Sequence, residues 1–199
     1  VRLRVDLDNP DIEIQALVRD HEFLLGLNTT GESLSKRRYR VYQHPAPLKP
    51  TIACSLLRIA GWEPGSYLID PMCGGGTIPI EAALMARRIP PGSFRSDFAF
   101  KKLRFLDRFL IEEIRESAWE ESNSWAYPIR GVEKFMKHVR GAIANAQSAG
   151  VIDTLVLEKG DATKPIYSPQ PDFIVTNPPY GLRIASKSTT LELYEKFSK

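Results

Sequence analysis

The pattern of hydrophobic and polar positions divides the chain into strands, helices and loops. Residues 1–7 alternate apolar and charged side chains, which predicts a half-buried strand, and two more strands are expected at 12–17 and 23–28. Further along, short apolar runs predict strands and helical periodicity predicts helices. The expected order is a helix at 51–59 with Thr51 as N-cap, a strand at 67–70, a helix at 78–85, a strand at 128–133, a helix at 135–149, strands at 153–158 and 173–175, and a helix from about 189 to 197.

The alternation of strands and helices after residue 51 predicts an α/β fold. Such a chain forms a right-handed, mostly parallel, doubly wound sheet of the Rossmann type. Four strands are fewer than a complete sheet of this kind has, so we expect the C-terminal part of the sheet to be missing. The strands in residues 1–31 are expected to belong to a small β or α+β unit that also lacks its partner, and the proline-punctuated residues 32–50 are expected to be a linker.

Residues 93–126 are longer than an ordinary α/β connection and are interpreted as an insertion. Asp107 is expected to cap a helix in which apolar residues share one face. Packing against the body is the expected role of its aromatic side chains, and base stacking is the alternative. These side chains are Phe98, Phe100, Phe105, Phe109, Trp119 and Trp125.

Composition places the chain among ordinary globular proteins. Its 199 residues are 43% hydrophobic and 26% charged. Two cysteines are too few for a disulfide framework, and they lack metal-ligand spacing with the three histidines. We therefore expect no metal site and a reducing, cytoplasmic compartment. No apolar run is long enough to span a bilayer, so no membrane association is expected.

The net charge of +3 is mild, but the basic residues are clustered. One cluster comprises Lys36, Arg37, Arg38 and Arg40, and a second comprises Lys101, Lys102, Arg104 and Arg108. Either cluster can neutralise nucleic-acid phosphates or simply form a solvated face. Charge alone leaves both interpretations open.

Residues 177–180, Asn-Pro-Pro-Tyr, carry the clearest chemical signal. Pro178 and Pro179 stop the preceding apolar run and hold the chain in a stiff, extended elbow. The Asn177 side-chain oxygen and the Pro178 carbonyl can accept both hydrogens of an amine on an aromatic base, while the Tyr180 ring stacks on that base. A proline-rich loop that merely ends a buried strand is the alternative.

Acidic residues and glycines stand at the other expected strand ends. Asp70 ends the first strand of the sheet, and Gly74, Gly75 and Gly76 follow it in a turn that lets a ligand approach the backbone. Glu133 ends the next strand, where an acid can bind ribose hydroxyls. Asp161 follows the third strand of the sheet, where its carboxylate can accept a hydrogen bond from an adenine amine. In doubly wound sheets ligands bind beyond these ends, so a nucleoside-containing cofactor is expected there.

Together these segments resemble a known family. Residues 70–77 (Asp-Pro-Met-Cys-Gly-Gly-Gly-Thr), with Ile-Glu-Ala-Ala at 80–83, resemble motif I of the THUMP-associated RNA guanine-N2 methyltransferases. Residues 31–40 resemble the segment by which that family leaves its THUMP domain, and residues 44–51 resemble the stretch that closes over the methionine part of the cofactor. Residues 176–183 most resemble archaeal tRNA members. Two departures are the unusual Gly75 and the absence of most of the THUMP domain.

The resemblance covers nearly the whole chain and implies a fold, a cofactor and a site. Residues 1–31 would be the C-terminal part of a THUMP-type RNA-binding domain, and residues 51–199 a Rossmann-like methyltransferase domain. S-adenosylmethionine would be held by Pro47, Leu48, Thr51, Asp70, Met72, Gly74, Gly76, Thr77, Glu133, Asp161, Ala162 and Asn177. Catalysis would fall to Asn177, Pro178, Pro179 and Tyr180, and RNA binding to Lys36, Arg37, Arg38 and Arg40.

The expected reaction is methyl transfer to the exocyclic 2-amino group of a guanosine in tRNA. Three alternatives remain open at this point: an N6-adenine DNA methyltransferase, a ribosomal RNA guanine-N2 methyltransferase, and an RNA-binding module without catalysis. The target nucleotide and the oligomeric state are not predicted by these residues.

Overall fold

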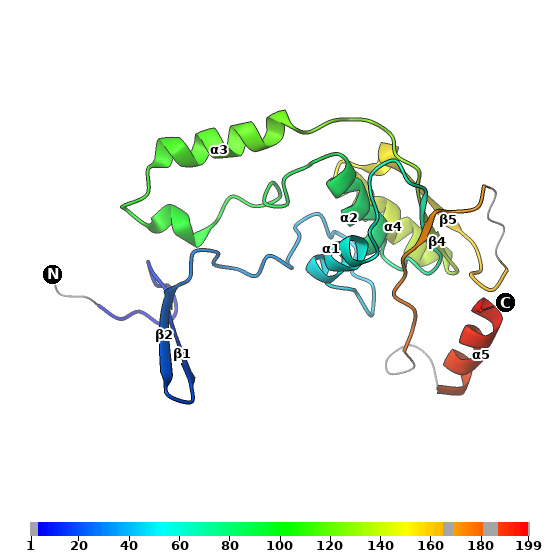
Figure 1. Ribbon diagram of the computed structural model, residues 1–199, viewed down its shortest axis with the longest axis horizontal. Helices are drawn as coiled ribbons and strands as arrows, with labels where there is room; N and C mark the ends of the chain where they lie inside the picture. Colours follow the sequence, from blue (N-terminus) through cyan, green and yellow to red (C-terminus); the bar gives the residue numbers. More distant parts are fainter. Residues whose placement is uncertain (1–3, 165–168, 181–186, 199) are drawn as a thin grey trace.

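The structure is a computed structural model that describes residues 4–164, 169–180 and 187–198. Its elements, in chain order, form a β-hairpin, a helix, and then a parallel sheet with helices (Figure 1). The strands are β1 (Ile14–Arg19), β2 (Glu22–Leu27), β3 (Leu68–Asp70), β4 (Ile129–Glu133), β5 (Leu155–Lys159) and β6 (Phe173–Ile174). The helices are α1 (Pro50–Ile59), α2 (Thr77–Ala86), α3 (Arg108–Glu120), α4 (Met136–Ser148) and α5 (Lys187–Phe197), with short 3-10 helices at Ala99–Lys102 and Ile152–Thr154.

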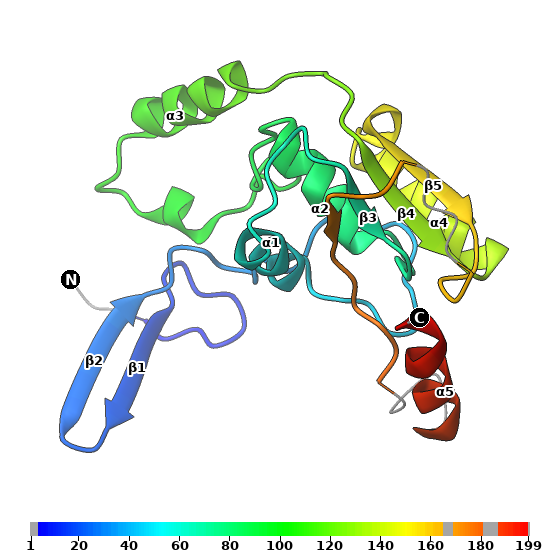
Figure 2. The ribbon, with the colours of Figure 1, turned by 45° about the vertical axis from the view of Figure 1, so that its right-hand side comes forward.

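The four-stranded sheet has the order β5-β4-β3-β6, and all its neighbours pair in parallel. Figure 2 shows β3, β4 and β5 side by side, with α2 and α4 near them. The chain moves outward from β3 to β5 and then returns to place β6 on the other side of β3. This reversal confirms the predicted doubly wound fold, and its switch point lies between β3 and β6.

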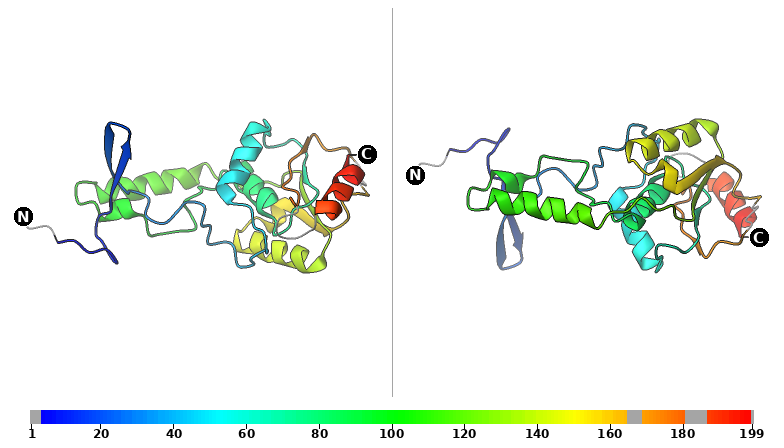
Figure 3. Two further views of the ribbon diagram at one scale, coloured as in Figure 1. Left: turned by 90° about the horizontal axis from the view of Figure 1, so that it is seen from below. Right: turned by 90° about the horizontal axis from the view of Figure 1, so that it is seen from above.

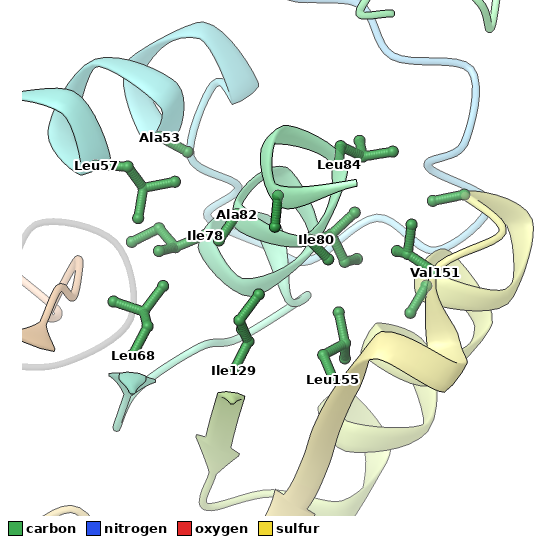
Figure 4. Close-up of a cluster of buried hydrophobic side chains, with 14 of the residues drawn as sticks. Ala53, Leu57, Leu68, Ile78, Ile80, Ala82, Leu84, Ile129, Val151 and Leu155 are labelled. Carbon is green, nitrogen blue, oxygen red and sulfur yellow. The ribbon is translucent and has the colours of Figure 1, made fainter. Parts of the chain in front are cut away.

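One face of the sheet carries the core. Leu68, Ile129 and Leu155 lie in register on neighbouring strands and are all buried. They point toward Ile78 and Ile80 of α2, as Figure 4 shows. Almost every residue of α2 is buried, and α1 packs on its other side. A helix surrounded in this way is apolar on nearly every face, with the buried Glu81 as its one carboxylate, and it holds the glycine turn at its N-terminus in place.

The N-terminal residues form an antiparallel hairpin rather than three strands. β1 and β2 pair from Ile14–Leu27 to Arg19–Glu22, which confirms the second and third predicted strands within a few residues. The strand predicted at 1–7 is wrong for residues 4–7, which have no strand partner, and residues 1–3 lie outside the described residues. Alternation predicts a strand only where a neighbouring strand supplies hydrogen bonds.

The insertion extends away from the sheet. In both views of Figure 3, α3 and the β1–β2 hairpin lie at one end of the molecule and the sheet lies at the other. Asp107 caps α3 as predicted, since its side chain accepts from the Phe109 N–H at 2.8 Å. The expectation that the aromatic residues pack onto the body is wrong for the outer ones: Phe105 is 75% and Phe109 78% exposed, and Trp119 and Trp125 are exposed too.

Polar contacts anchor the insertion at its two ends. Arg95 donates to the carbonyls of Thr30 and Glu32, just after the hairpin. At the other end, Arg87 donates from Nε to the Asn123 carbonyl and accepts from the Asn123 N–H. The insertion is therefore held by its stems, and its middle needs no apolar contact with the body.

Among the described residues, no helix combines the length and the apolar character needed to cross a membrane.

Candidate active site

The Asn-Pro-Pro-Tyr elbow leaves the sheet directly beside β3. The Val175 N–H donates to the Ile69 carbonyl at 3.1 Å, which extends the pairing of β6 with β3. The Thr176 hydroxyl then donates to Asp70 Oδ1 at 2.7 Å. The elbow and the end of β3 are therefore fastened to each other at the switch point of the sheet.

Within the elbow, two predicted catalytic residues contact each other. The Tyr180 hydroxyl donates to Asn177 Oδ1 at 2.6 Å, and the Tyr180 side chain is 64% exposed. The Pro179 carbonyl accepts from the Tyr194 hydroxyl of α5 at 2.9 Å. Asn177 thus presents its acceptor at the surface, where a neighbouring hydroxyl already occupies it.

Asp70 is a buried carboxylate at the end of β3. Both hydrogen bonds described for it reach Oδ1, one from Thr176 and one from the Met72 N–H at 3.1 Å. Burial raises the pKa of Asp70 to about 7, and these two hydrogen bonds oppose that shift. A carboxyl group with this pKa changes charge close to neutral pH, and such groups are concentrated at functional sites.

The glycine turn after β3 joins this carboxylate to the next strand. Gly74 and Gly76 have φ of +55° and +80°, the left-handed region in which glycine is unstrained. The Gly74 N–H donates to Glu133 Oε2 at 3.1 Å, and Glu133 Oε1 accepts from the Phe135 N–H at 2.9 Å. Glu133 is buried at the end of β4. Predicted residues from two strand ends are thereby brought into contact.

Asp161 follows β5 and is held in a local turn. Its Oδ1 accepts from the Thr163 N–H and hydroxyl, at 3.0 and 2.7 Å. These hydrogen bonds lower the pKa of Asp161, and Lys134 at 3.4 Å from Oδ2 adds to the effect. Ala162 beside it is buried. Asp161 therefore stays ionised at neutral pH and can accept hydrogen bonds.

Residues 40–48, which we call the strap, cross the glycine turn before the chain enters α1. Arg40 donates to the Leu48 carbonyl and to the Thr77 hydroxyl, the latter at 2.9 Å. The His44 ring lies against Gly74, where a Cβ would be 3.4 Å from its Nε2. A small cavity of about 50 Å³ between strap and turn is lined by Arg40, Tyr42, Gln43, His44, Pro47, Gly75, Thr77 and Asn145.

The start of α1 corrects one predicted detail. The N-cap is Lys49, not Thr51, and Pro50 is the first helical residue. Proline suits that position because its missing N–H would have no partner there and its φ is already helical. Thr51 therefore lies inside the first turn, and its carbonyl accepts from the Ser55 hydroxyl.

The basic cluster of the linker divides into two structural classes. The Arg37 side chain is only 8% exposed and forms two hydrogen bonds to Glu81 of α2, at 3.2 and 3.3 Å. Arg40 is engaged inside the strap. By contrast, Lys36 and Arg38 are exposed and pair with surface carboxylates. We therefore revise the predicted phosphate contacts: Arg37 and Arg40 are held by the fold, and Lys36 and Arg38 remain candidates.

Three residues near the turn were missed by sequence reasoning: Tyr42, His138 and Asn145. Asn145 lies on the buried face of α4 with Ala142 and Ala146, and a buried amide on an apolar helix face is a signal that it binds a polar partner. That signal does not identify the partner. Among the described residues, no group of three or more His, Cys, Asp or Glu is placed to hold a metal ion.

Comparison with known proteins assigns the chain to a family. The family of RMKL-like methyltransferase domains matches residues 37–199. The chain belongs to this family. The match includes the strap, the glycine turn and the Asn-Pro-Pro-Tyr elbow. These three segments therefore lie within the part of the chain that matches a methyltransferase domain.

Relatives of this RMKL-like methyltransferase domain include two archaeal proteins. A tRNA (guanine(6)-N2)-methyltransferase of Methanocaldococcus jannaschii is 44% identical over 99% of the chain. One of Archaeoglobus fulgidus with the same name is 47% identical over the whole chain. The chain spans about half the length of these relatives, 52% and 47% respectively.

A solved structure supports the same assignment. The crystal structure of SMU.472 complexed with SAH matches with a TM-score of 0.84 and 30% sequence identity, and the match covers 95% of this chain and 49% of that one. The fold of this RMKL-like domain is therefore shared with a protein that binds SAH.

Proposed function

We propose that this chain is the methyltransferase domain of an enzyme that transfers a methyl group from S-adenosylmethionine to the 2-amino group of a guanosine in tRNA, in the cytoplasm. The observation that carries the proposal is the hydrogen bond from Thr176 to Asp70. It joins an elbow suited to a nucleobase amine to a glycine turn suited to the cofactor. The names of the two archaeal relatives support tRNA guanosine as the target.

The residues at the strand ends fit S-adenosylmethionine. This cofactor carries an ammonium group, a ribose diol and an adenine amine, and each of these donates hydrogen bonds. The chain offers a carboxylate after each of three neighbouring strands, namely Asp70, Glu133 and Asp161. We assign them to the ammonium, the diol and the adenine amine in that order. Bound S-adenosylmethionine supplies an electrophilic methyl group on a positively charged sulfur.

The elbow makes the guanosine amine a better nucleophile. The lone pair of this amine is delocalised into the base, so the free base reacts slowly. Asn177 Oδ1 and the Pro178 carbonyl would accept hydrogen bonds from its two N–H groups, which would stabilise the positive charge that develops on nitrogen as it takes the methyl group. The nitrogen would then lose one of these protons to water. Tyr180 would stack on the base and hold its amine in the orientation needed for methyl transfer. Its hydroxyl first leaves Asn177 Oδ1, which is feasible because the side chain is exposed.

Replacement of Asn177 by alanine tests this role. Removal of one preorganised acceptor is expected to lower kcat on the order of 100-fold, while the dissociation constant of S-adenosylmethionine changes little. Full-length enzyme, tRNA and methyl-labelled cofactor give the rate, and isothermal calorimetry gives the affinity. Gln147→Ala, which removes an exposed amide from α4, is the matched control. Near-normal turnover by Asn177→Ala contradicts the assignment.

A substrate panel tests the target. We expect N2-methylguanosine in nucleosides from treated tRNA, detected by mass spectrometry. Methylation confined to ribosomal RNA fragments, or N6-methyladenine in duplex DNA, would replace the tRNA proposal with one of the other enzyme classes. An absence of cofactor binding by the full-length protein would instead favour a module that only binds RNA.

A further inference from the structure

One face of α4 forms a seat for the strap. Gly141 and Asn145 lie four positions apart on this helix and therefore on the same side of it. The Tyr42 ring covers Gly141 so closely that a Cβ at this position would be 2.1 Å from Tyr42 Cδ1. The position thus accepts glycine alone as long as Tyr42 stays where it is.

Asn145 connects the strap to the glycine turn. Its Oδ1 accepts from the Tyr42 N–H at 2.8 Å, and its Nδ2 donates to the Tyr42 carbonyl at 3.1 Å and to the Gly75 carbonyl at 3.0 Å. The side chain is buried, so loss of these partners would leave an unsatisfied amide in the interior. The Asn145 side chain thereby sets the distance between Tyr42 in the strap and Gly75 in the glycine turn, which are 33 residues apart in the sequence.

A second set of contacts extends this seat to the part of the turn expected to face the cofactor. The Tyr42 hydroxyl lies 2.5 Å from His138 Nδ1. The His138 ring packs edge-on against His44, with ring centroids 4.4 Å apart, and His44 lies against Gly74. Tyr42 therefore fixes His44 through His138, and His44 in turn lies on the glycine turn.

We propose that Gly141 and Asn145 are positioning residues that set the affinity for the methionine end of S-adenosylmethionine, because they hold the strap and the glycine turn at one fixed spacing. This inference rests on the proposed function. Neither residue belongs to the strand ends or the elbow, so each acts through Tyr42 and Gly75. The spacing affects cofactor binding, whereas the amine-binding elbow lies on the other side of Asp70 and is unaffected.

Gly141→Ala is the decisive variant. Alanine favours a helix over glycine, so the substitution changes little except that the Tyr42 ring must leave its seat. We expect the KM and the dissociation constant for S-adenosylmethionine to rise about tenfold, which corresponds to about 1.4 kcal/mol. With saturating cofactor, kcat and the KM for tRNA should stay within about twofold of wild type. Arg140→Ala, at the exposed neighbouring position, is the control and should match wild type.

A double variant separates positioning from general destabilisation. Tyr42→Ala should weaken cofactor binding by itself, and adding Gly141→Ala should then change nothing, because the ring that clashes is gone. Tyr42→Phe keeps the ring on Gly141 but loses the hydroxyl contact to His138, so its affinity for S-adenosylmethionine should lie between those of wild type and Tyr42→Ala. If Gly141→Ala instead lowers kcat with an unchanged KM for the cofactor, or weakens binding equally in the Tyr42→Ala background, the inference is overturned.

The proposed function and this inference fail in different ways. If wild-type full-length protein does not bind S-adenosylmethionine in calorimetry, the proposed function fails. If wild type binds and Gly141→Ala binds equally well, only the positioning role of the seat fails.

Discussion

Asp70→Asn tests the buried carboxylate at the centre of the site. Asparagine has nearly the same shape and keeps an oxygen that can accept from Thr176 and from the Met72 N–H. It replaces the other carboxylate oxygen by an amide NH2 group, which removes the negative charge and adds two donors at a buried position. We expect the variant to be more stable than wild type at pH 8 and to bind S-adenosylmethionine less tightly.

The pH-dependent part of the stability gain follows from the pKa of Asp70. Burial raises it from 3.8 to about 7 in the folded protein, so between these values the folded state holds a proton that the unfolded state has lost. Wild-type stability therefore falls as pH rises through this window, and the loss is complete above pH 7. At about 1.4 kcal/mol per pH unit, roughly three units correspond to about 4 kcal/mol, or about 8–16 °C in Tm.

The assay is thermal or urea unfolding of wild type and variant at a series of pH values from 5 to 8.5. The difference between the two proteins isolates the effect of Asp70, because every other titratable group is common to both. Asp161→Asn is the control, because the pKa of Asp161 is lowered and this group titrates below the window. The difference in free energy of unfolding between Asp161→Asn and wild type should be the same at every pH of the series.

Two results would refute the reasoning. If the free energies of unfolding of wild type and variant differ by the same amount at pH 5 and at pH 8, ionisation of Asp70 does not destabilise the folded protein. A variant that binds S-adenosylmethionine as tightly as wild type would mean that Asp70 does not bind the ammonium group. We expect the dissociation constant to rise at least tenfold, since hydrogen bonds to charged groups contribute about 1.5–3 kcal/mol.

Two further pairs of variants separate roles that single variants leave mixed. Tyr180→Phe keeps the stacking ring and frees Asn177 Oδ1, so kcat/KM for tRNA should be retained or raised. Tyr180→Ala should lower kcat/KM at least about fivefold, because it removes the stacking ring. Equal losses in the two variants would show that the hydroxyl is needed. Arg37→Ala leaves the buried Glu81 without its cation and should lower the free energy of unfolding in urea by about 3–5 kcal/mol. Arg38→Ala breaks an exposed ion pair and should lower it by less than about 1 kcal/mol. The Arg38→Ala variant should, however, bind tRNA more weakly in a filter assay. A larger stability loss for Arg38→Ala than for Arg37→Ala would contradict the division of the basic cluster.

The sheet could be predicted because its signals are local. The parallel strands are short and rich in apolar residues, and three of them end at a charged residue: Asp70 in β3, Glu133 in β4 and Lys159 in β5. Since parallel strands end at the same edge, strand-end residues far apart in the sequence were expected to meet, and Gly74 and Glu133 do so. The order of the strands, β5-β4-β3-β6, was not predicted and comes from the structure.

The role of Arg37 could not be predicted from its own neighbourhood. Four basic residues within five positions look the same whether they face solvent or a buried acid. The informative residue was Glu81, a single carboxylate inside the apolar helix α2, where it also accepts from the Tyr39 hydroxyl at 2.7 Å. A buried carboxylate requires a cation or several donors, but no rule of spacing connects it to Arg37, which is 44 residues away.

The packing of the outer aromatic residues of the insertion was mispredicted for a different reason. Aromatic residues usually pack in a core, and composition cannot show whether a core lies within reach. Here the stems at Arg95 and Asn123 hold residues 96–122 away from the sheet, so Phe105 and Phe109 remain exposed. Whether these aromatic side chains reach the core therefore depends on the three-dimensional path of the insertion.

The link between Thr176 and Asp70 separates two effects of acid on this site. A protonated Asp70 can still accept from the Thr176 hydroxyl, so the elbow keeps its position when the carboxyl group becomes neutral. The attraction for the cofactor ammonium group, however, needs the charge, which is lost as pH falls below about 7. Affinity for S-adenosylmethionine should therefore decrease from pH 8 to pH 6 while the Asp70 contribution to fold stability increases. Calorimetry and unfolding at the same pH values check this opposition, and a cofactor affinity that rises together with stability as pH falls would contradict it.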